Sequence, residues 1–215
     1  TALARDLLLV EESGVKAHFS QISCARSVEL IADAKKRGLP VTCDVAIHQL
    51  HLSEMDLLGF NSLFNVSPPL RSMSDKQALI LGVKSGIIDA IVSDHTPLEK
   101  DDKLLPFGES APGISGLESL LPLLLKLVQE GSIELMTAIR CVTQMPAQII
   151  DCQRGSLAEG SSADLCIIDP EAIWTLETQN MLSEGKNTPF SGWEFVGQVE
   201  HTFFQGRPVF KSSQA

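Results

Sequence analysis

The sequence predicts an α/β fold in which helices alternate with parallel strands, followed by a smaller β-rich region. Amphipathic stretches alternate with short apolar runs over roughly the first 150 of the 215 residues. One run, Ile87 to Val92, is apolar nearly throughout, as expected of a parallel strand buried on both faces. After about Asp151, short runs separated by Gly, Pro, Ser and Asn are typical of short strands and tight turns.

The first elements follow these signals in turn. Apolar residues at helical spacing predict a helix over 2–13, with Gly14 just past its end. Val15 to Phe19 is the first expected strand. Ser23 is the expected cap of a second helix, whose apolar stripe ends in a basic last turn before Gly38.

The same cycle continues along the chain. Leu39 to Ile47 predicts the next strand, and a helix over about 74–84 stops at Gly86. The remaining expected elements are the strand Ile87 to Val92 and helices at Leu117 to Gln129 and Ile133 to Thr143. Five short β runs follow, at 156–157, 163–168, 173–176, 195–204 and 208–210. We therefore expect an α/β domain over 1–150 and a β-rich region over 151–215.

Charge and hydropathy narrow the function classes. The chain has 17 basic and 27 acidic side chains, a net charge of -10, which argues against nucleic acid or an anionic membrane as partner. Its longest apolar stretches, around Leu120 to Leu125, fall far short of the ~20 residues that a membrane span needs. We expect no secretory leader and a cytoplasmic location.

Cysteine usage and the first residue give two further expectations. Five cysteines, an odd number without a Cys-x-x-Cys pair, favour buried free thiols over a disulfide framework or a zinc ribbon. The chain starts at Thr1 and runs at once into helix-like sequence, so we expect a preceding segment.

Polar residues at the ends of the strands are the first candidates for a site, because active sites of parallel α/β folds lie there. Asp94, in Ser-Asp-His-Thr-Pro (93–97), directly follows a buried apolar strand. Its carboxylate therefore faces either the mouth of the fold or an unfavourable apolar core. At the mouth, Asp94 is placed to be a metal ligand or general base. The structural alternative is that it caps the following turn.

Three further groups each allow two interpretations. His48 and His51, three residues apart after a strand, suit a metal, but loop histidines are more often hydrogen-bonded surface groups. Arg71, on a proline-stiffened loop, suits a substrate carboxylate or a structural ion pair. Gly113 and Gly116 precede a helix, so their amides suit an anion or simply form the turn that starts the helix.

Five ordered motifs run along the chain. They are Ser-Pro-Pro-Leu-Arg (67–71), Ser-Asp-His-Thr-Pro (93–97), Pro-Phe-Gly-Glu-x-x-Pro-Gly-x-x-Gly-Leu-Glu (106–118), Gly-Ser-Leu-Ala-Glu-Gly-x-x-Ala-Asp-Leu (155–165) and Gly-Lys-Asn-Thr-Pro-Phe-x-Gly (185–192). Together they resemble the C-terminal half of dihydroorotases, which are amidohydrolases that interconvert carbamoyl-aspartate and dihydroorotate in pyrimidine biosynthesis. The resemblance implies the last part of a metal-dependent (β/α)₈ TIM barrel, followed by part of a small β-rich composite domain.

The resemblance also implies a metal site. The family holds one or two zinc ions that activate a water, with an aspartate on the eighth strand as proton acceptor. Asp94 matches that aspartate and is the implied catalytic and metal-binding residue. Gln21, in His-Phe-Ser-Gln-Ile-Ser (18–23), stands at the position of a family histidine ligand. Because an amide oxygen is a poor zinc ligand, this change weakens the implied site. The first-, fourth- and fifth-strand ligands belong to sequence outside this chain.

The matching motifs further imply a substrate-binding set, Ser67, Arg71, His95, Pro112 and Gly113. Two positions depart from the family, which often has Asn where this chain has Ser67 and a second His where it has Leu98. Losing an amide and an imidazole removes hydrogen bonds to the substrate carboxylate.

These departures favour a degenerate dihydroorotase without zinc, resembling bacterial dihydroorotase-like proteins that act as structural partners of aspartate carbamoyltransferase. The runner-up is a working zinc-dependent dihydroorotase when the chain is joined to its N-terminal half. A third class, a hydantoinase or allantoinase, is disfavoured by Pro-Pro-Leu-Arg. Three strands of an eight-stranded barrel leave unpaired edges, so we also expect the N-terminal half or a second copy of the chain as a partner.

Overall fold

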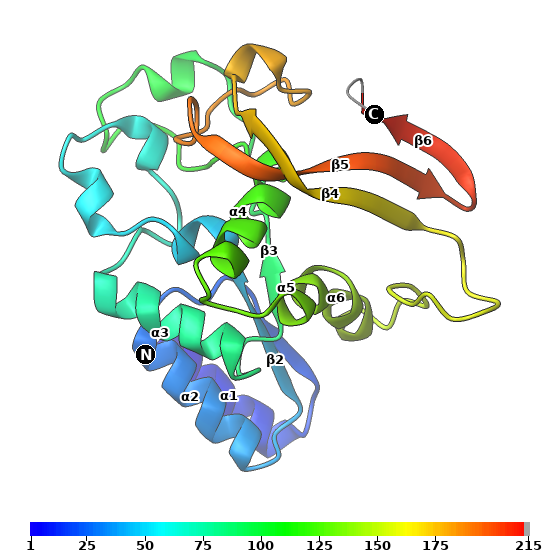
Figure 1. Cartoon of the computed structure of the whole chain (residues 1–215). Helices are drawn as coiled ribbons and strands as arrows, with labels where there is room; N and C mark the ends of the chain where they lie inside the picture. Colours follow the sequence, from blue (N-terminus) through cyan, green and yellow to red (C-terminus); the bar gives the residue numbers. More distant parts are fainter. Residues whose placement is uncertain (213–215) are drawn as a thin grey trace.

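The computed structural model describes residues 1–212 and shows two three-stranded sheets, with most helices gathered around the parallel one (Figure 1). No helix in this range is long and apolar enough to cross a membrane. The helices are α1 (Ala2–Ser13), α2 (Ala25–Lys36), α3 (Met73–Lys84), α4 (Leu117–Gln129), α5 (Leu135–Val142) and α6 (Gln144–Ile149). The strands are β1 (Ala17–Phe19), β2 (Val41–Ala46), β3 (Ala90–Val92), β4 (Leu165–Thr175), β5 (Glu194–Phe204) and β6 (Arg207–Lys211). Short 3₁₀ helices are η1 (Ile47–Leu50), η2 (Glu54–Leu57), η3 (Ser62–Phe64), η4 (Asp101–Lys103) and η5 (Thr178–Asn180).

The first sheet is parallel and has the strand order β1-β2-β3, which confirms the predicted α/β fold. Ala17 pairs with Val41 in one ladder, and Asp44 pairs with Ala90 in the other. Helix α2 packs against β2 and against both α1 and α3, and these three helices lie together in Figure 1. Because consecutive strands are neighbours joined through helices, their carboxyl ends meet at one edge of the sheet.

Strand β3 is shorter than the apolar run that predicted it. The run begins at Ile87, but the amides of Ile87 and Ile88 both donate to the carbonyl of Gly82, at 2.9 and 3.0 Å. Both residues therefore belong to the turn that ends α3, and strand pairing begins only at Ala90. Ile88 is nevertheless buried, since only 1% of it is exposed. Strands β1 and β2 likewise begin later than predicted, because the residues before them do not pair.

Helix α2 does not begin with the predicted serine cap. Its N-cap residue is Cys24, whose side chain accepts no capping hydrogen bond. The carboxylate of Asp75, in α3, accepts the amide hydrogen of Ala25 at 2.8 Å instead. The hydroxyl of Ser23 lies 3.5 Å from Nε of Arg71. One orphan amide of this helix start, that of Ala25, is thus satisfied from a neighbouring helix, which no local pattern reveals.

The second sheet is antiparallel, with the order β4-β5-β6. The two runs predicted at 163–168 and 173–176 form one strand, β4, with a register shift between Asp169 and Ile173. The strand predicted at Ser156 and Leu157 is wrong: both residues lie outside the strands, and 87% of Leu157 is exposed. Without a neighbouring strand or an apolar surface to cover, this short run has nothing to stabilise it as a strand.

One hydrophobic core links the two sheets. Buried side chains of α2, α3, α4 and β5, such as Ile31, Leu79, Leu124 and Phe195, belong to the same cluster. Helix α4 packs so closely on β5 that a Cβ atom at Gly197 would overlap the Leu125 side chain. The β-rich region is thus packed on the helical part, and the division at residue 150 stays a prediction.

Candidate functional site

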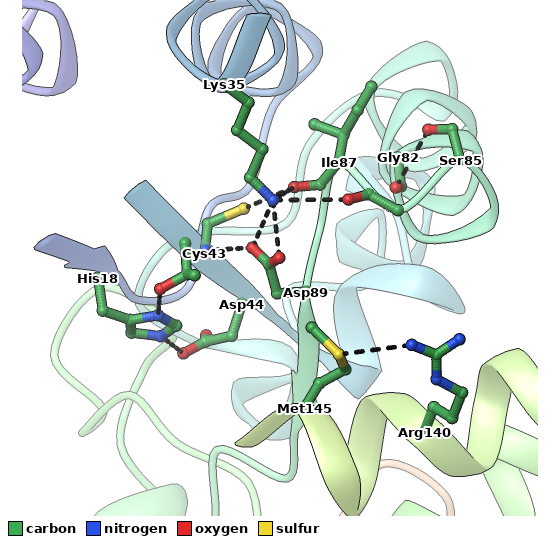
Figure 2. Close-up of polar contacts among 12 residues, drawn as sticks. His18, Lys35, Cys43, Asp44, Gly82, Ser85, Ile87, Asp89, Arg140 and Met145 are labelled. Atoms are coloured by element: carbon green, nitrogen blue, oxygen red, sulfur yellow. Dashed lines mark hydrogen bonds and ion pairs between the residues drawn. The ribbon is translucent and has the colours of Figure 1, made fainter. Parts of the chain in front are cut away.

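The candidate site lies at the carboxyl edge of the parallel sheet, as the sequence predicts. His18 is in β1, Asp44 is in β2, Gln21 follows β1, and Asp94 follows β3. Figure 2 shows the His18 ring turned toward the Asp44 carboxylate. Hydrogen bonds connect these four residues into one network.

Asp44 is the buried centre of this network, with only 4% of the residue exposed. Its Oδ1 accepts the backbone amide hydrogen of Gln21 at 2.7 Å, and its Oδ2 lies 2.8 Å from Nε2 of His18. Nδ1 of the same ring lies 2.8 Å from the hydroxyl of Thr42. Because an ionised carboxylate only accepts, Nε2 of His18 carries the hydrogen in this pair. Sequence analysis assigned no role to Asp44. Its position inside the mostly apolar run Val41 to Ala46 was the available signal.

Gln21 and Asp94 form the second half of the network. Nε2 of Gln21 donates to Oδ1 of Asp94 at 2.5 Å. Both residues have left-handed backbones, with φ of 55° and 47° respectively. Such conformations are costly for non-glycine residues and persist where the surroundings hold them. The two strained residues are joined by their own side chains, so their geometry is mutually fixed.

The electrostatics of Asp94 follow from this setting. Burial raises the pKa of its carboxyl, the hydrogen bond from Gln21 opposes this, and the nearby Asp44 raises it further. The structural alternative, a side chain that caps the next turn, is not what the structure shows, because the carboxylate is bonded to Gln21. A carboxyl with a raised pKa at a strand end suits proton transfer, provided that a substrate proton can reach it.

The residues at this edge do not by themselves fit a zinc ion. Zinc in proteins takes three or four His, Cys or carboxylate ligands. Within residues 1–212 no three such side chains gather at one point. Gln21 must present its NH₂ group to Asp94, since the carboxylate only accepts, so it offers no oxygen toward that residue. His18 is engaged with Asp44 and Thr42 through its two ring nitrogens.

His48 and His51 have separate environments. Nε2 of His51 lies 2.9 Å from the carbonyl oxygen of Leu123, in α4, so the hydrogen-bonded alternative applies to this residue. His48 is 1% exposed, and neither ring nitrogen has a hydrogen-bond partner in the described part of the chain. Burial lowers the pKa of each imidazole to about 4, so both rings are neutral near pH 7. A buried imidazole without a partner was not foreseen from the sequence.

Ser67 and Arg71 lie on the loop that follows η3. Ser67 is exposed and precedes a cis peptide bond to Pro68. Arg71 is also exposed, its guanidinium makes no ion pair within residues 1–212, and Nε reaches only the hydroxyl of Ser23. The structural ion pair is therefore not seen here. Their assignment as substrate-binding residues stays a prediction.

Backbone amides of the glycine-rich segment before α4 donate hydrogen bonds within the chain. The Gly113 amide donates to the carbonyl of Asn65 at 2.8 Å. The amides of Gly116 and Leu117 donate to Nδ1 of His95, at 3.1 and 3.3 Å. His95 therefore caps α4 and keeps its remaining ring hydrogen on Nε2 when neutral. The helix-start interpretation is the one that the structure shows. Pro112 is exposed beside this turn, and the substrate roles of His95, Pro112 and Gly113 stay predictions.

Asn187 joins the motifs in space, a role that sequence reasoning missed although Asn187 stands in a quoted motif. Its Oδ1 accepts from the Leu98 amide at 2.9 Å and from the Ser115 hydroxyl at 2.8 Å. Its Nδ2 donates to the carbonyls of Thr96 and Gly113, at 2.9 and 3.0 Å. A fully used, buried amide thus ties the segments that contain Asp94, the glycine turn and residues 185–192 together.

Two curated relatives match nearly the whole chain. A dihydroorotase-like protein of Pseudomonas aeruginosa is 50% identical over 205 residues, which cover 95% of this chain and 48% of the relative. A dihydroorotase of Syntrophus aciditrophicus is 43% identical over 209 residues, which cover 97% of this chain and 49% of the relative. The chain therefore spans about half the length of the curated relatives it matches.

Solved structures and a family model also match this chain. An L-hydantoinase from Arthrobacter aurescens matches with a TM-score of 0.92 at 29% identity, over 98% of this chain and 48% of that one. The inactive dihydroorotase-like domain of the Chaetomium thermophilum CAD-like multifunctional protein matches with a TM-score of 0.75 at 25% identity, over 97% and 55%. These matches confirm that the chain forms part of a metal-dependent-hydrolase barrel. Proteins of this family are generally metal-dependent. The model of the amidohydrolase family matches residues 1–209. The chain therefore belongs to the amidohydrolase family.

Proposed function

We propose that this chain is part of a dihydroorotase-like protein of pyrimidine biosynthesis that has lost the hydrolase reaction and acts as a structural partner of aspartate carbamoyltransferase. The observation that carries the proposal is the contact between Gln21 and Asp94. In dihydroorotases, which the motifs resemble, a histidine ligand stands at the position of Gln21.

A glutamine at this position opposes catalysis in two ways. Its carboxamide hydrogen engages one of the two carboxylate oxygens of Asp94, the group that would bind a metal ion or accept a proton from a reacting water. The same change also replaces an imidazole nitrogen with an amide, which is a weak zinc ligand. Gln21 donates to both neighbouring carboxylates, through its backbone amide to Asp44 and through its side chain to Asp94.

The names of the relatives support the proposal. The Pseudomonas aeruginosa and Pseudomonas putida relatives, 50% and 48% identical, are both called dihydroorotase-like. The first relative called dihydroorotase is 43% identical. The Chaetomium thermophilum domain is called inactive.

A second candidate function is zinc-dependent dihydroorotase activity of the chain joined to its N-terminal half. It is favoured by relatives that are called dihydroorotase and match 97% and 98% of this chain. The two candidates differ in turnover. We expect a polypeptide that joins both halves to show no hydrolysis of dihydroorotate by ultraviolet absorbance, whereas measurable turnover that zinc chelation abolishes would favour the second candidate.

The partner proposal has its own test. Purified aspartate carbamoyltransferase should co-elute with the joined polypeptide in size-exclusion chromatography, and Asp94→Ala should leave the complex intact, because we place the contact on an outer surface. Failure of the parent to co-elute would refute the partnership, and loss of co-elution in Asp94→Ala alone would place the contact at the old site.

We also propose that another polypeptide segment covers the open edges of the parallel sheet. Strand β1 pairs only with β2, and so does β3, within residues 1–212. Unpaired edges of this kind attract further strands. The N-terminal half of the barrel, or a second copy of this chain, would supply them. Light scattering coupled to chromatography should therefore show an assembly, and a compact 23.3 kDa monomer would refute this proposal.

A further inference from the structure

A cavity lies at the opposite end of the parallel sheet from Asp94. It has a volume of roughly 330 Å³ and is bounded by the end of α3, the start of β3, and helices α5 and α6. Asp89, which lines it, directly precedes β3, whereas Asp94 follows that strand. The cavity is thus separate from the candidate site. Its volume is at the lower end of the range for small-molecule sites, ~300–1,000 Å³.

The acidic group of this cavity is already neutralised. Both carboxylate oxygens of Asp89 lie 2.7 Å from Nζ of Lys35, and Oδ2 also accepts the amide hydrogen of Cys43 at 2.8 Å. Figure 2 shows Lys35 and Cys43 converging on this carboxylate, with Arg140 on the neighbouring helix. Asp89 therefore needs no cation from the other side of the cavity.

Two cations at the cavity are not used by the chain itself. The guanidinium of Arg140 has only the sulfur of Met145, at 4.0 Å, as a polar contact within residues 1–212. The ammonium of Lys84 makes no ion pair in the same range. Both residues are exposed at the cavity. What distinguishes these two cations from other unpaired cations of the chain is that they line the same cavity.

The cavity floor is apolar. Val83, Ile88 and Cys141 are buried there, with 1%, 1% and 5% exposed. Burial and the Asp89 carboxylate raise the pKa of the Cys141 thiol, so it is uncharged near pH 7. The arrangement combines an apolar floor with cations from α3 and α5. Two separate cations, one with a planar fork, match a dianionic phosphate better than a single carboxylate.

We propose that this cavity binds a small phosphate monoester, with the phosphate between Lys84 and Arg140 and an apolar body against Met145, which lines the cavity and is half-buried. The site does not depend on whether the mouth of the barrel catalyses. Because the sites lie at opposite ends of the sheet, binding here is distinguishable from any result on dihydroorotate.

The test is isothermal titration of the 215-residue chain with four probes. Phenyl phosphate carries both proposed features, inorganic phosphate carries only the head, phenol carries only the body, and benzoate replaces the phosphate with a carboxylate. We expect saturable 1:1 binding of phenyl phosphate, weaker binding of inorganic phosphate and benzoate, and none of phenol. Added salt should weaken the binding.

Substitutions inside and outside the cavity test whether phenyl phosphate binds there. Arg140→Gln should weaken phenyl phosphate binding by ~10-fold or more, as loss of a charge-assisted hydrogen bond implies. Lys84→Gln should also weaken it, whereas Arg207→Gln, which removes an exposed arginine of β6, should change it less than about twofold. Far-UV circular dichroism confirms that each variant is folded. The proposal fails if phenyl phosphate does not saturate, if phenol or benzoate binds as tightly, or if Arg140→Gln and Arg207→Gln have equal effects.

Discussion

Acid should destabilise this protein through His48. The folded pKa of this imidazole is about 4, whereas its ordinary value is 6.5, because burial disfavours the charged ring. Between these two values the unfolded chain takes up a proton that the folded chain refuses. The stabilisation is therefore complete above about pH 6.5 and is lost as the pH falls toward 4. Between pH 7 and pH 5 the linkage relation gives a loss of about 2 kcal/mol from this one residue.

The measurement is the free energy of unfolding in urea at pH 7 and pH 5, for the parent and for His48→Leu. Leucine fills a similar volume and removes two ring nitrogens that have no partner in the described part of the chain. We expect the variant to be no less stable at pH 7. Its loss between pH 7 and pH 5 should be smaller than that of the parent by about 2 kcal/mol.

The comparison isolates His48, because every other titrating group is common to both proteins. His51, whose pKa burial also lowers to about 4, contributes equally to both. Equal pH dependence of parent and variant would refute a neutral, buried His48. A large loss of stability in His48→Leu at pH 7 would show that its nitrogens are hydrogen-bonded in the folded protein.

Two further predictions concern stability. Gly113→Ala should lower the free energy of unfolding by about 2 kcal/mol, because φ is 144° and the added Cβ would lie 2.6 Å from Cγ2 of Thr96. Urea unfolding checks this against Gly59→Ala, which meets nothing within 4 Å, and equal effects would contradict the crowding. Lys35→Met should cost about 3 kcal/mol because it leaves Asp89 buried without its cation. Arg26→Met, in an exposed ion pair, should cost less than about 1 kcal/mol in the same assay, and a similar cost for both would argue against a buried pair.

Local sequence signals predicted most of the first half of the fold. Helix α1 ends at Gly14 as expected, since that residue adopts φ of 67° and its amide bonds to the carbonyl of Val10. Helix α4 has the predicted bounds although Pro122 lies inside it, because leucines dominate its buried face. The predicted element bounds were wrong where specific backbone contacts determine the local structure. The amides of Ile87 and Ile88 bond to Gly82, so an apolar run became a turn.

The candidate site could be located from the sequence, but its internal contacts could not. Asp94 and Gln21 were singled out because each lies after a strand or in a motif. That the two bond to each other depends on β1 and β3 flanking β2, and no local pattern reveals it, because the two residues are 73 positions apart. The same holds for Asn187, which bonds to Thr96 across 91 positions.

We propose that Gln21 stands in place of a metal ligand and donates a hydrogen bond to Asp94 instead. The most direct test is the zinc affinity of the polypeptide that joins this chain to its N-terminal half, measured for the parent and for Gln21→His by competition with a chelator. Atomic emission gives the zinc content of each purified protein. We expect no stoichiometric zinc in the parent and an affinity at least ~100-fold higher in Gln21→His, if the other ligands are present. Stoichiometric zinc in the parent, with an affinity that Gln21→His leaves unchanged, would contradict this proposal.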